Sequence, residues 1–316
     1  MATTPRTSPP MYFPPSPFVL ADVVTCANLV GVAYDQYCQW EAQGKPSHWR
    51  DFTWTPAWPA GFAASVVSLP LWGYAREIFF ENPEPFGFAV QDASKRGFLV
   101  FRGTESDADW YKNIEVKQTP YTLVTKPDFG KVHDGFFGIY ASMSPGVIVA
   151  VNQIAATSTR FFFTGHSLGS SLVTLAVPDV LTNSAMNISR APALHYNFAS
   201  PRTGDATFAT ALDAMTSVTT FRIVNTEDIV PDVPPAVTDD LFDTYYYKHV
   251  GTPVDFTAQY DSIAGNHSML NSYLYAVTHP GQPEGPIVAP TPCQPKLPAG
   301  LRQTTPPAPK DAPSRG

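Results

Sequence analysis

The segment "RFFFTGHSLGSSLVTLA", residues 160–176, constrains the fold of this chain more than any other part. Its three consecutive aromatic residues are typical of a buried strand, and the small and apolar residues that follow are typical of a helix. Between them, Gly165, Ser167 and Gly169 form the pattern Gly-x-Ser-x-Gly. This pattern also occurs in ordinary glycine-rich turns, but between a strand and a helix it indicates a sharp turn that exposes a nucleophilic serine. The sequence therefore predicts Ser167 as a nucleophile.

Strand-like and helix-like segments alternate along the interior of the chain. This alternation predicts an α/β fold with a mostly parallel central sheet flanked by helices, in which ligands gather at the carboxyl ends of the strands. A helix is expected in 18–40, two strands in 86–103 around a turn at 92–96, a helix after Pro145, a strand in 160–165, a helix in 166–181, and strands that begin near 193 and 216.

Proline marks the edges of the predicted domain. Residues 1–18 and 280–316 are rich in proline, and such segments are expected to be extended or disordered. One α/β domain is therefore expected over residues 19–279. Its composition, 44% hydrophobic and 15% charged, is that of a globular protein, and the net charge of −7 disfavours nucleic acids and anionic membranes as partners.

The cysteines and the N-terminus give weak information about the compartment. Three cysteines, Cys26, Cys38 and Cys293, allow at most one disulfide, and buried thiols are the expectation. No cysteine–histidine spacing resembles a zinc site, and no run of 18 apolar residues predicts a membrane span. No signal peptide is visible, so a cytoplasmic location is the default expectation, or an extracellular one if a leader was removed.

A serine hydroxyl needs a histidine to accept its proton, and with this type of turn the histidine follows the acid in the chain. His195 falls in a predicted buried strand, and His279 begins the proline-rich tail. His249 lies in an aromatic, strand-like run, where a structural hydrogen bond is expected. His267 follows a Gly-Asn loop, and loops carry catalytic side chains, so His267 is the predicted base.

The acid is sought in "NTEDIVPD", directly after the predicted strand near residue 216. Asp228 stands closest to the strand end, whereas Asp232 lies further along in a proline-rich loop that is expected to face solvent. Glu227 is adjacent to Asp228 and should point the opposite way in an extended segment. Asp228 is therefore the predicted acid. His166 cannot curl back onto the neighbouring hydroxyl and is expected to pack or bond beneath the turn.

An acyl-transfer site also needs N–H donors for the oxyanion. The N–H of Leu168, directly after the nucleophile, is the first candidate. The second is Thr104, because "FRGT" ends a predicted strand and Gly103 permits close approach of the backbone.

Seven segments follow one another along the chain: "FRGTESDADW", "VHDGFFGIY", "FTGHSLGSSL", "NFASPRTGD", "RIVNTEDIVPDVPP", "YKHVGTPV" and "NHSMLNSYL". Together and in this order they resemble the fungal-type, or class 3, triacylglycerol lipases, a family with related feruloyl esterases. The resemblance implies an α/β-hydrolase fold with Ser167, Asp228 and His267 as catalytic triad, and Thr104 and Leu168 as oxyanion donors that bind the substrate. It also implies a short lid helix within residues 105–121. Ser170 and Ala199 stand where the family usually has glycine.

The expected function is carboxylic ester hydrolysis through an acyl-enzyme, without metal or other cofactor. A triacylglycerol lipase, acting on acyl esters at a lipid–water interface, is the first expectation. A feruloyl or other soluble-ester esterase, a thioesterase or acyltransferase, and a catalytically inactive lipid-binding or interaction protein remain alternatives. Oligomeric state is left open. Residues that could line an acyl groove are Phe136, Phe137, Ile229, Val230, Val237 and Leu241.

Overall fold

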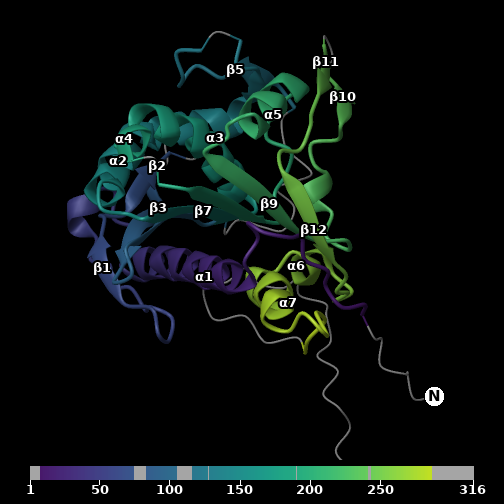
Figure 1. Ribbon diagram of the computed structural model, residues 1–316, viewed down its shortest axis with the longest axis horizontal. Coiled ribbons are helices and arrows are strands. Elements are labelled where there is room, and N and C mark those ends of the chain that lie inside the picture. Colours follow the sequence, from purple (N-terminus) through teal and green to yellow (C-terminus); the bar gives the residue numbers. More distant parts are fainter. Residues whose placement is uncertain are drawn as a thin grey trace, which may run out of the picture.

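A computed structural model of the chain describes residues 8–74, 83–104, 116–126, 128–189, 191–240 and 243–286. The main sheet has eight strands, ordered β1–β3–β4–β7–β8–β9–β12, with β2 also paired to β3. The strands from β4 to β12 run parallel, whereas β1, β2 and β3 pair antiparallel. The predicted, mostly parallel sheet is therefore confirmed (Figure 1). Its strands are β1 (Ala64–Val67), β2 (Leu71–Gly73), β3 (Glu84–Asp92), β4 (Arg96–Phe101), β7 (Arg160–His166), β8 (Ala193–Phe198), β9 (Val218–Asn225) and β12 (Thr252–Phe256).

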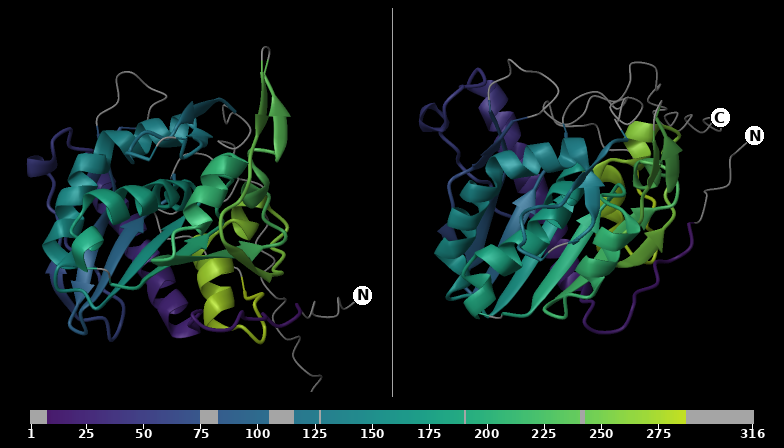
Figure 2. Two further views of the ribbon diagram at one scale, coloured as in Figure 1. Left: turned by 45° about the horizontal axis from the view of Figure 1, so that its top comes forward. Right: turned by 90° about the horizontal axis from the view of Figure 1, so that it is seen from above.

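The aromatic run in β7 is explained by burial on both faces of the sheet. Successive side chains of a strand point to opposite faces. Phe161 and Phe163 therefore pack in the core beneath α2 and α3, whereas Phe162 packs in the core beneath α1. Figures 1 and 2 show α1, α6 and α7 on one face of the sheet and α2, α3 and α5 on the other. The helices are α1 (Leu20–Ala42), α2 (Asp134–Ala155), α3 (Leu168–Asn183), α4 (Met186–Ser189), α5 (Ala206–Asp213), α6 (Ile263–Asn266) and α7 (Tyr275–Thr278).

The remaining elements are short. Two small two-stranded sheets accompany the main one, and the β10–β11 hairpin projects from the body of the fold (Figure 1). They comprise β5 (Gln118–Pro120) with β6 (Lys131–His133), and β10 (Val237–Asp239) with β11 (Thr244–Tyr246). Helical turns of other types are the 3₁₀ turns Trp49–Asp51 and Val230–Asp232 and the π-helical segment Met269–Leu274.

The predicted start of α2 is wrong. The helix begins at Asp134 rather than after Pro145, which lies inside it. The His133 imidazole accepts the N–H of Phe136 at 3.2 Å and caps the helix. The first turns of the helix also bury apolar side chains, and this burial stabilises a helix that continues through Pro145. Length and composition would let α2 cross a membrane, and the same properties belong to a core helix; here it packs against α3 and contributes to the core.

Proline-rich residues on either side of the predicted domain pack against each other. Met11 and Phe18 are buried in the α1 core, and the Met11 N–H donates to the Pro280 carbonyl at 2.8 Å. The Ser8 hydroxyl donates to the Glu284 carboxylate at 2.9 Å. The described parts of these segments are thus held on the fold without helix or strand, and the boundaries at residues 19 and 279 stay a prediction.

The cysteines differ from the expectation in one respect. Cys26 is a free thiol, fully buried in α1, and burial raises its pKa. Cys38, which lies later in the same helix, is disulfide-bonded, so the expectation of a buried thiol is wrong for Cys38. Cys293 lies outside the described residues. The positions of the cysteines along the sequence do not reveal which of them lie within bonding distance of each other.

Candidate active site

Ser167 occupies a strained turn between β7 and α3. Its backbone has φ of +56°, a conformation that non-glycine residues rarely adopt. The two flanking glycines are required, because a Cβ at Gly165 would collide with the backbone of Gly169, and a Cβ at Gly169 would collide with the carbonyl of Arg102. The Ser167 N–H donates to the carbonyl of Phe198 at 3.0 Å, which ties the turn to β8. The predicted strand–turn–helix geometry is therefore present.

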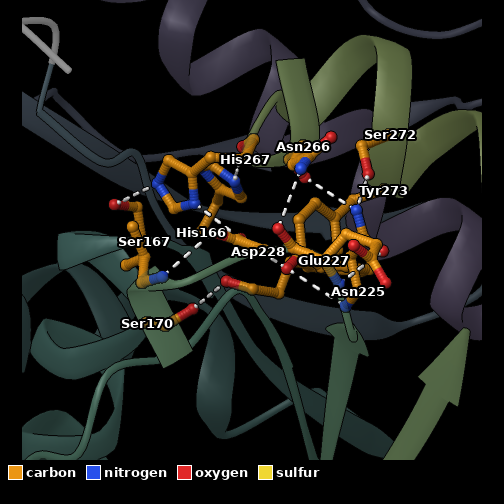
Figure 3. Close-up of polar contacts among 12 residues, drawn as sticks. His166, Ser167, Ser170, Asn225, Glu227, Asp228, Asn266, His267, Ser272 and Tyr273 are labelled. Carbon is orange, nitrogen blue, oxygen red and sulfur yellow. Dashed lines mark hydrogen bonds and ion pairs between the residues drawn. The ribbon is translucent and has the colours of Figure 1, made fainter. Parts of the chain in front are cut away.

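The structure brings the three predicted triad residues together (Figure 3). The His267 Nε2 lies 2.8 Å from the Ser167 Oγ, and its Nδ1 lies 2.7 Å from the Asp228 Oδ2. Ser167 and Asp228 are buried, whereas His267 is partly exposed. A proton can therefore pass from the hydroxyl to an imidazole whose other nitrogen is oriented by a buried carboxylate.

Asp228 is held by two further donors. Its Oδ1 accepts the N–H of Val230 at 3.0 Å, and its Oδ2 accepts the hydroxyl of Tyr273 at 2.7 Å. Tyr273 is fully buried, and burial, together with the negative charge of Asp228, raises the pKa of its hydroxyl well above the usual value. Tyr273 therefore remains a donor, and the carboxylate has three donors around it, which compensate its burial.

Asn225, the last residue of β9, ties the acid loop to the histidine loop. Its side-chain amide donates to the backbone carbonyls of Asn266 at 3.0 Å and Ala258 at 2.9 Å. The Asn266 side chain in turn donates to the carbonyl of Glu227 at 2.8 Å (Figure 3). The residues before Asp228 and before His267 are thus bonded to each other, and this fixes the spacing of acid and base.

The histidines that the sequence set aside lie away from the serine hydroxyl. His195 is fully buried, and burial lowers its pKa to about 3. His249 bonds the Pro231 carbonyl at 2.9 Å, and burial, then the charges of Arg222 and Arg202, lower its pKa to about 3. Both are neutral structural residues, as expected. His279 is exposed and stacks on Tyr275.

The alternative acids also lie as expected. Asp232 bonds Arg202, and its side chain is 79% exposed. Glu227 accepts a bond from the Gln259 amide at 2.8 Å, whereas the imidazole of His267 bonds Asp228. Asp228 is the acid that contacts the predicted base.

The candidate oxyanion donors lie at the same end of the sheet. Thr104 follows β4, and its hydroxyl is buried without a hydrogen-bond partner among the described residues. Leu168 begins α3, so its N–H is one of the first-turn donors that a helix leaves unpaired. Arg102 is buried and donates to the carbonyl of Gly103 at 2.7 Å, which holds the segment before Thr104. The predicted lid, within residues 105–121, falls largely on residues 105–115, which lie outside the described residues.

Sequence reasoning missed the supporting side chains Tyr273, Asn225 and Tyr34, the last of which bonds the His166 Nδ1 through its hydroxyl at 2.7 Å. Each acts on residues far away in the chain, and no local spacing marks such contacts. The one available signal was Asn225 at a strand end, where a buried amide often bonds backbone carbonyls. In the described part of the chain, no group of three or more His, Cys, Asp or Glu side chains could hold a metal ion.

Residues 98–238 match the model of a family described as Lipase (class 3). The phospholipase A1-II 3 of Oryza sativa subsp. japonica is 31% identical over 188 residues, 52% of this chain and 43% of that protein. A lipase of Rhizomucor miehei is 31% identical over 147 residues, 46% of this chain and 39% of that protein. The chain thus spans less than half the length of these two relatives.

A solved structure shows the same fold. The Rhizomucor miehei triacylglyceride lipase superposes with a TM-score of 0.50 at 21% identity, over 75% of this chain and 81% of that one. The arrangement is an α/β-hydrolase fold, and residues 98–238 of this chain resemble the class 3 lipase family.

Proposed function

We propose that this chain is a serine carboxylic ester hydrolase that acts through an acyl-enzyme. Ser167 attacks the ester carbonyl while the His267 Nε2 takes its proton, and Asp228 orients the imidazole and stabilises its positive charge. Thr104 and the N–H of Leu168 hold the negative oxygen of the tetrahedral intermediate. The protonated imidazole then gives its proton to the leaving alcohol, and water repeats the cycle on the acyl-enzyme.

One observation carries this proposal: the unbroken hydrogen-bonded series Ser167–His267–Asp228 at a turn that strains the serine backbone. Backbone strain at a single residue costs about 1–3 kcal/mol and is retained where the geometry serves a function. The hydroxyl of Thr104, buried without a partner among the described residues, adds support, because a buried polar group without a partner is rare unless a ligand supplies one. An inactive binding protein would need neither feature.

For the substrate, we infer an acylglycerol ester at a lipid–water interface. Apolar side chains are exposed beside the acid and on the nearby hairpin: Ile229 is 39%, Val237 57% and Tyr246 60% exposed, the last two as a cross-strand pair. Phe136 and Val230 are instead buried, Phe137 packs against the core, and Leu241 lies outside the described residues. Four of the six groove candidates are therefore unsuited or undescribed, and Ile229 and Val237 remain the best placed.

A phospholipid is the second candidate substrate. The rice relative bears the name phospholipase A1, and the Rhizomucor relative is named a lipase, so both lipid classes occur among similar proteins. The net charge of −7 favours neutral or zwitterionic over anionic lipid surfaces.

The disulfide at Cys38 supports an oxidising compartment, because cytosolic disulfides are rare. Of the two locations considered from the sequence, we propose the extracellular one.

The test is a substrate panel with Ser167→Ala as the control. The wild type should hydrolyse emulsified triolein and short nitrophenyl esters, and a fluorophosphonate should label it once per chain. Ser167→Ala should fold with the same circular dichroism spectrum, lose labelling and lose turnover by at least a factor of about 10³. Retained turnover in this variant would end the assignment. Faster cleavage of phosphatidylcholine vesicles or of methyl ferulate than of triolein would move the substrate to those classes.

A further inference from the structure

His166, beside the nucleophile, bonds away from the reaction centre. Its Nε2 lies 2.9 Å from the backbone carbonyl of His267, and its Nδ1 lies 2.7 Å from the hydroxyl of Tyr34 on α1. The imidazole is buried. Burial, and secondarily the neighbouring His267 ring, lower its pKa well below the usual value, so the ring stays neutral. The proposed mechanism gives this ring no proton to transfer.

The directions of these bonds can be assigned. A carbonyl only accepts, so the proton of the neutral His166 ring must lie on Nε2. Nδ1 is then an acceptor, and the Tyr34 hydroxyl must donate to it. The Tyr34 oxygen in turn accepts the N–H of Gly103 at 3.1 Å. Every donor and acceptor in this series is compatible with its neighbours.

The series connects two parts of the proposed site. At one end, Gly103 precedes the oxyanion candidate Thr104, and its backbone lies so close that an added Cβ would approach the Tyr34 hydroxyl to 2.6 Å and the His166 carbonyl to 2.9 Å. At the other end is the backbone of His267, whose ring faces Ser167. Tyr34 lies outside the residues that match the family model, and α1, the helix that contains it, lies on the opposite face of the sheet from α3 (Figure 1).

We propose that Tyr34 and His166 are positioning residues that hold the segment Gly103–Thr104 and the predicted base His267 in one hydrogen-bonded unit. The oxyanion site is then formed before substrate binds. The inference rests on the proposed ester hydrolase function. Loss of the series lets the segment 103–104 move by fractions of an ångström, which affects the transition state more than substrate binding.

Tyr34→Phe removes one hydroxyl and keeps the buried ring. With a short nitrophenyl ester, kcat should fall roughly 10- to 100-fold while KM changes less than about twofold. Inactivation by a fluorophosphonate, which also places a negative oxygen in the oxyanion site, should slow by the same factor. The matched control is Tyr140→Phe, which removes another buried hydroxyl, one that bonds Asp179 at 2.7 Å between α2 and α3. It should lower the unfolding temperature without changing kcat.

Variants at His166 test the series from its other member. The side chain of His166→Gln can still accept from Tyr34 and donate to the His267 carbonyl, whereas His166→Phe can do neither. The glutamine variant should therefore keep at least about fivefold more of kcat than the phenylalanine variant. The double variant Tyr34→Phe/His166→Phe should lose no more than the worse single variant, because both break the same series.

The inference and the proposed function can fail separately. A wild type that cleaves no ester would overturn the proposed function. An active wild type with Tyr34→Phe at full kcat, or with losses that multiply in the double variant, would overturn the inference. Nitrogen NMR of the His166 ring needs no activity: it should show protonated Nε2 and bare Nδ1, with Nδ1 shifted in Tyr34→Phe and not in Tyr140→Phe. The opposite tautomer would contradict the series as well.

Discussion

Asp228→Asn is the sharpest test of the proposed triad, because it changes hydrogen-bond direction and leaves the shape of the side chain. In the structure, Asp228 accepts three bonds: one from the Val230 N–H on Oδ1, and one each from Tyr273 and His267 on Oδ2. An amide offers one oxygen and one NH₂. The buried N–H of Val230 cannot change direction, so we expect the amide oxygen to stay there and the NH₂ to face the His267 ring.

That arrangement traps the wrong tautomer of His267. An NH₂ group opposite Nδ1 makes Nδ1 an acceptor and moves the ring proton to Nε2, where it faces the Ser167 hydroxyl as a donor. The imidazole then cannot take the serine proton. The analogous change in a serine protease triad lowers kcat about 10⁴-fold, equivalent to about 5 kcal/mol in the barrier. The Tyr273 hydroxyl also loses its charged acceptor, so the free energy of unfolding should fall by about 2 kcal/mol.

The assay measures kcat on a short nitrophenyl ester at neutral pH. Circular dichroism checks that each variant is folded, and intact mass checks its identity. The matched control is Asp232→Asn, in the same loop, whose carboxylate is exposed and bonds only Arg202 among the described residues. We expect the control to keep wild-type kcat. If Asp228→Asn stays within tenfold of the wild type, or if both variants lose activity equally, then Asp228 does not orient the imidazole.

Two further predictions concern stability. Gly31 lies at an exposed position within α1 with open space around its Cα, so Gly31→Ala should raise the free energy of unfolding by about 0.5–1 kcal/mol. Gly165→Ala should instead lower the free energy of unfolding by at least about 3 kcal/mol, because the added Cβ would collide with the backbone of Gly169. Denaturant titration measures both changes, and equal effects would contradict the assigned turn. Burial lowers the pKa of His195 to about 3, so the folded state binds fewer protons than the unfolded state below pH 6.5, and stability rises with pH. Acidification from pH 7 to pH 5 should therefore cost about 2 kcal/mol through His195, a loss that His195→Gln should remove from the pH dependence of urea unfolding.

Much of the site could be predicted from the sequence because the chemistry is encoded locally. Gly165 and Gly169 are needed by the backbone itself, so the motif predicts the turn wherever it follows a strand. His267 is predicted over His249 because His267 follows a loop and His249 lies in a strand-like run. In the structure, His249 bonds the backbone carbonyl of Pro231. In each case the deciding physical feature lies within a few residues of the side chain concerned.

The features that the sequence did not predict depend on tertiary contacts. The start of α2 lies before the predicted one because its first turns bury apolar side chains, and this burial exists only in the packed fold. The disulfide at Cys38 depends on a spatial distance. Tyr34, Tyr273 and Asn225 support the site from α1, the C-terminal helices and β9, so their roles follow from the strand order rather than from any spacing along the chain.

Ser170, in the first turn of α3, and Ala199, directly after β8, are the two positions that depart from the pattern of the resembled family, and they have opposite physical effects where the two segments meet. Ala199 has φ of +51°, where an alanine costs about 1–2 kcal/mol relative to glycine. The Ser170 hydroxyl lies 2.7 Å from the carbonyls of both Gly165 and Phe198, and so joins the serine turn to β8 directly before Ala199. A net hydrogen bond of this kind contributes about 1 kcal/mol. The two replacements can therefore offset each other where β7 and β8 meet. We infer that a glycine at 170 alone would leave the strained backbone at 199 less well held, and that the two positions act as a pair.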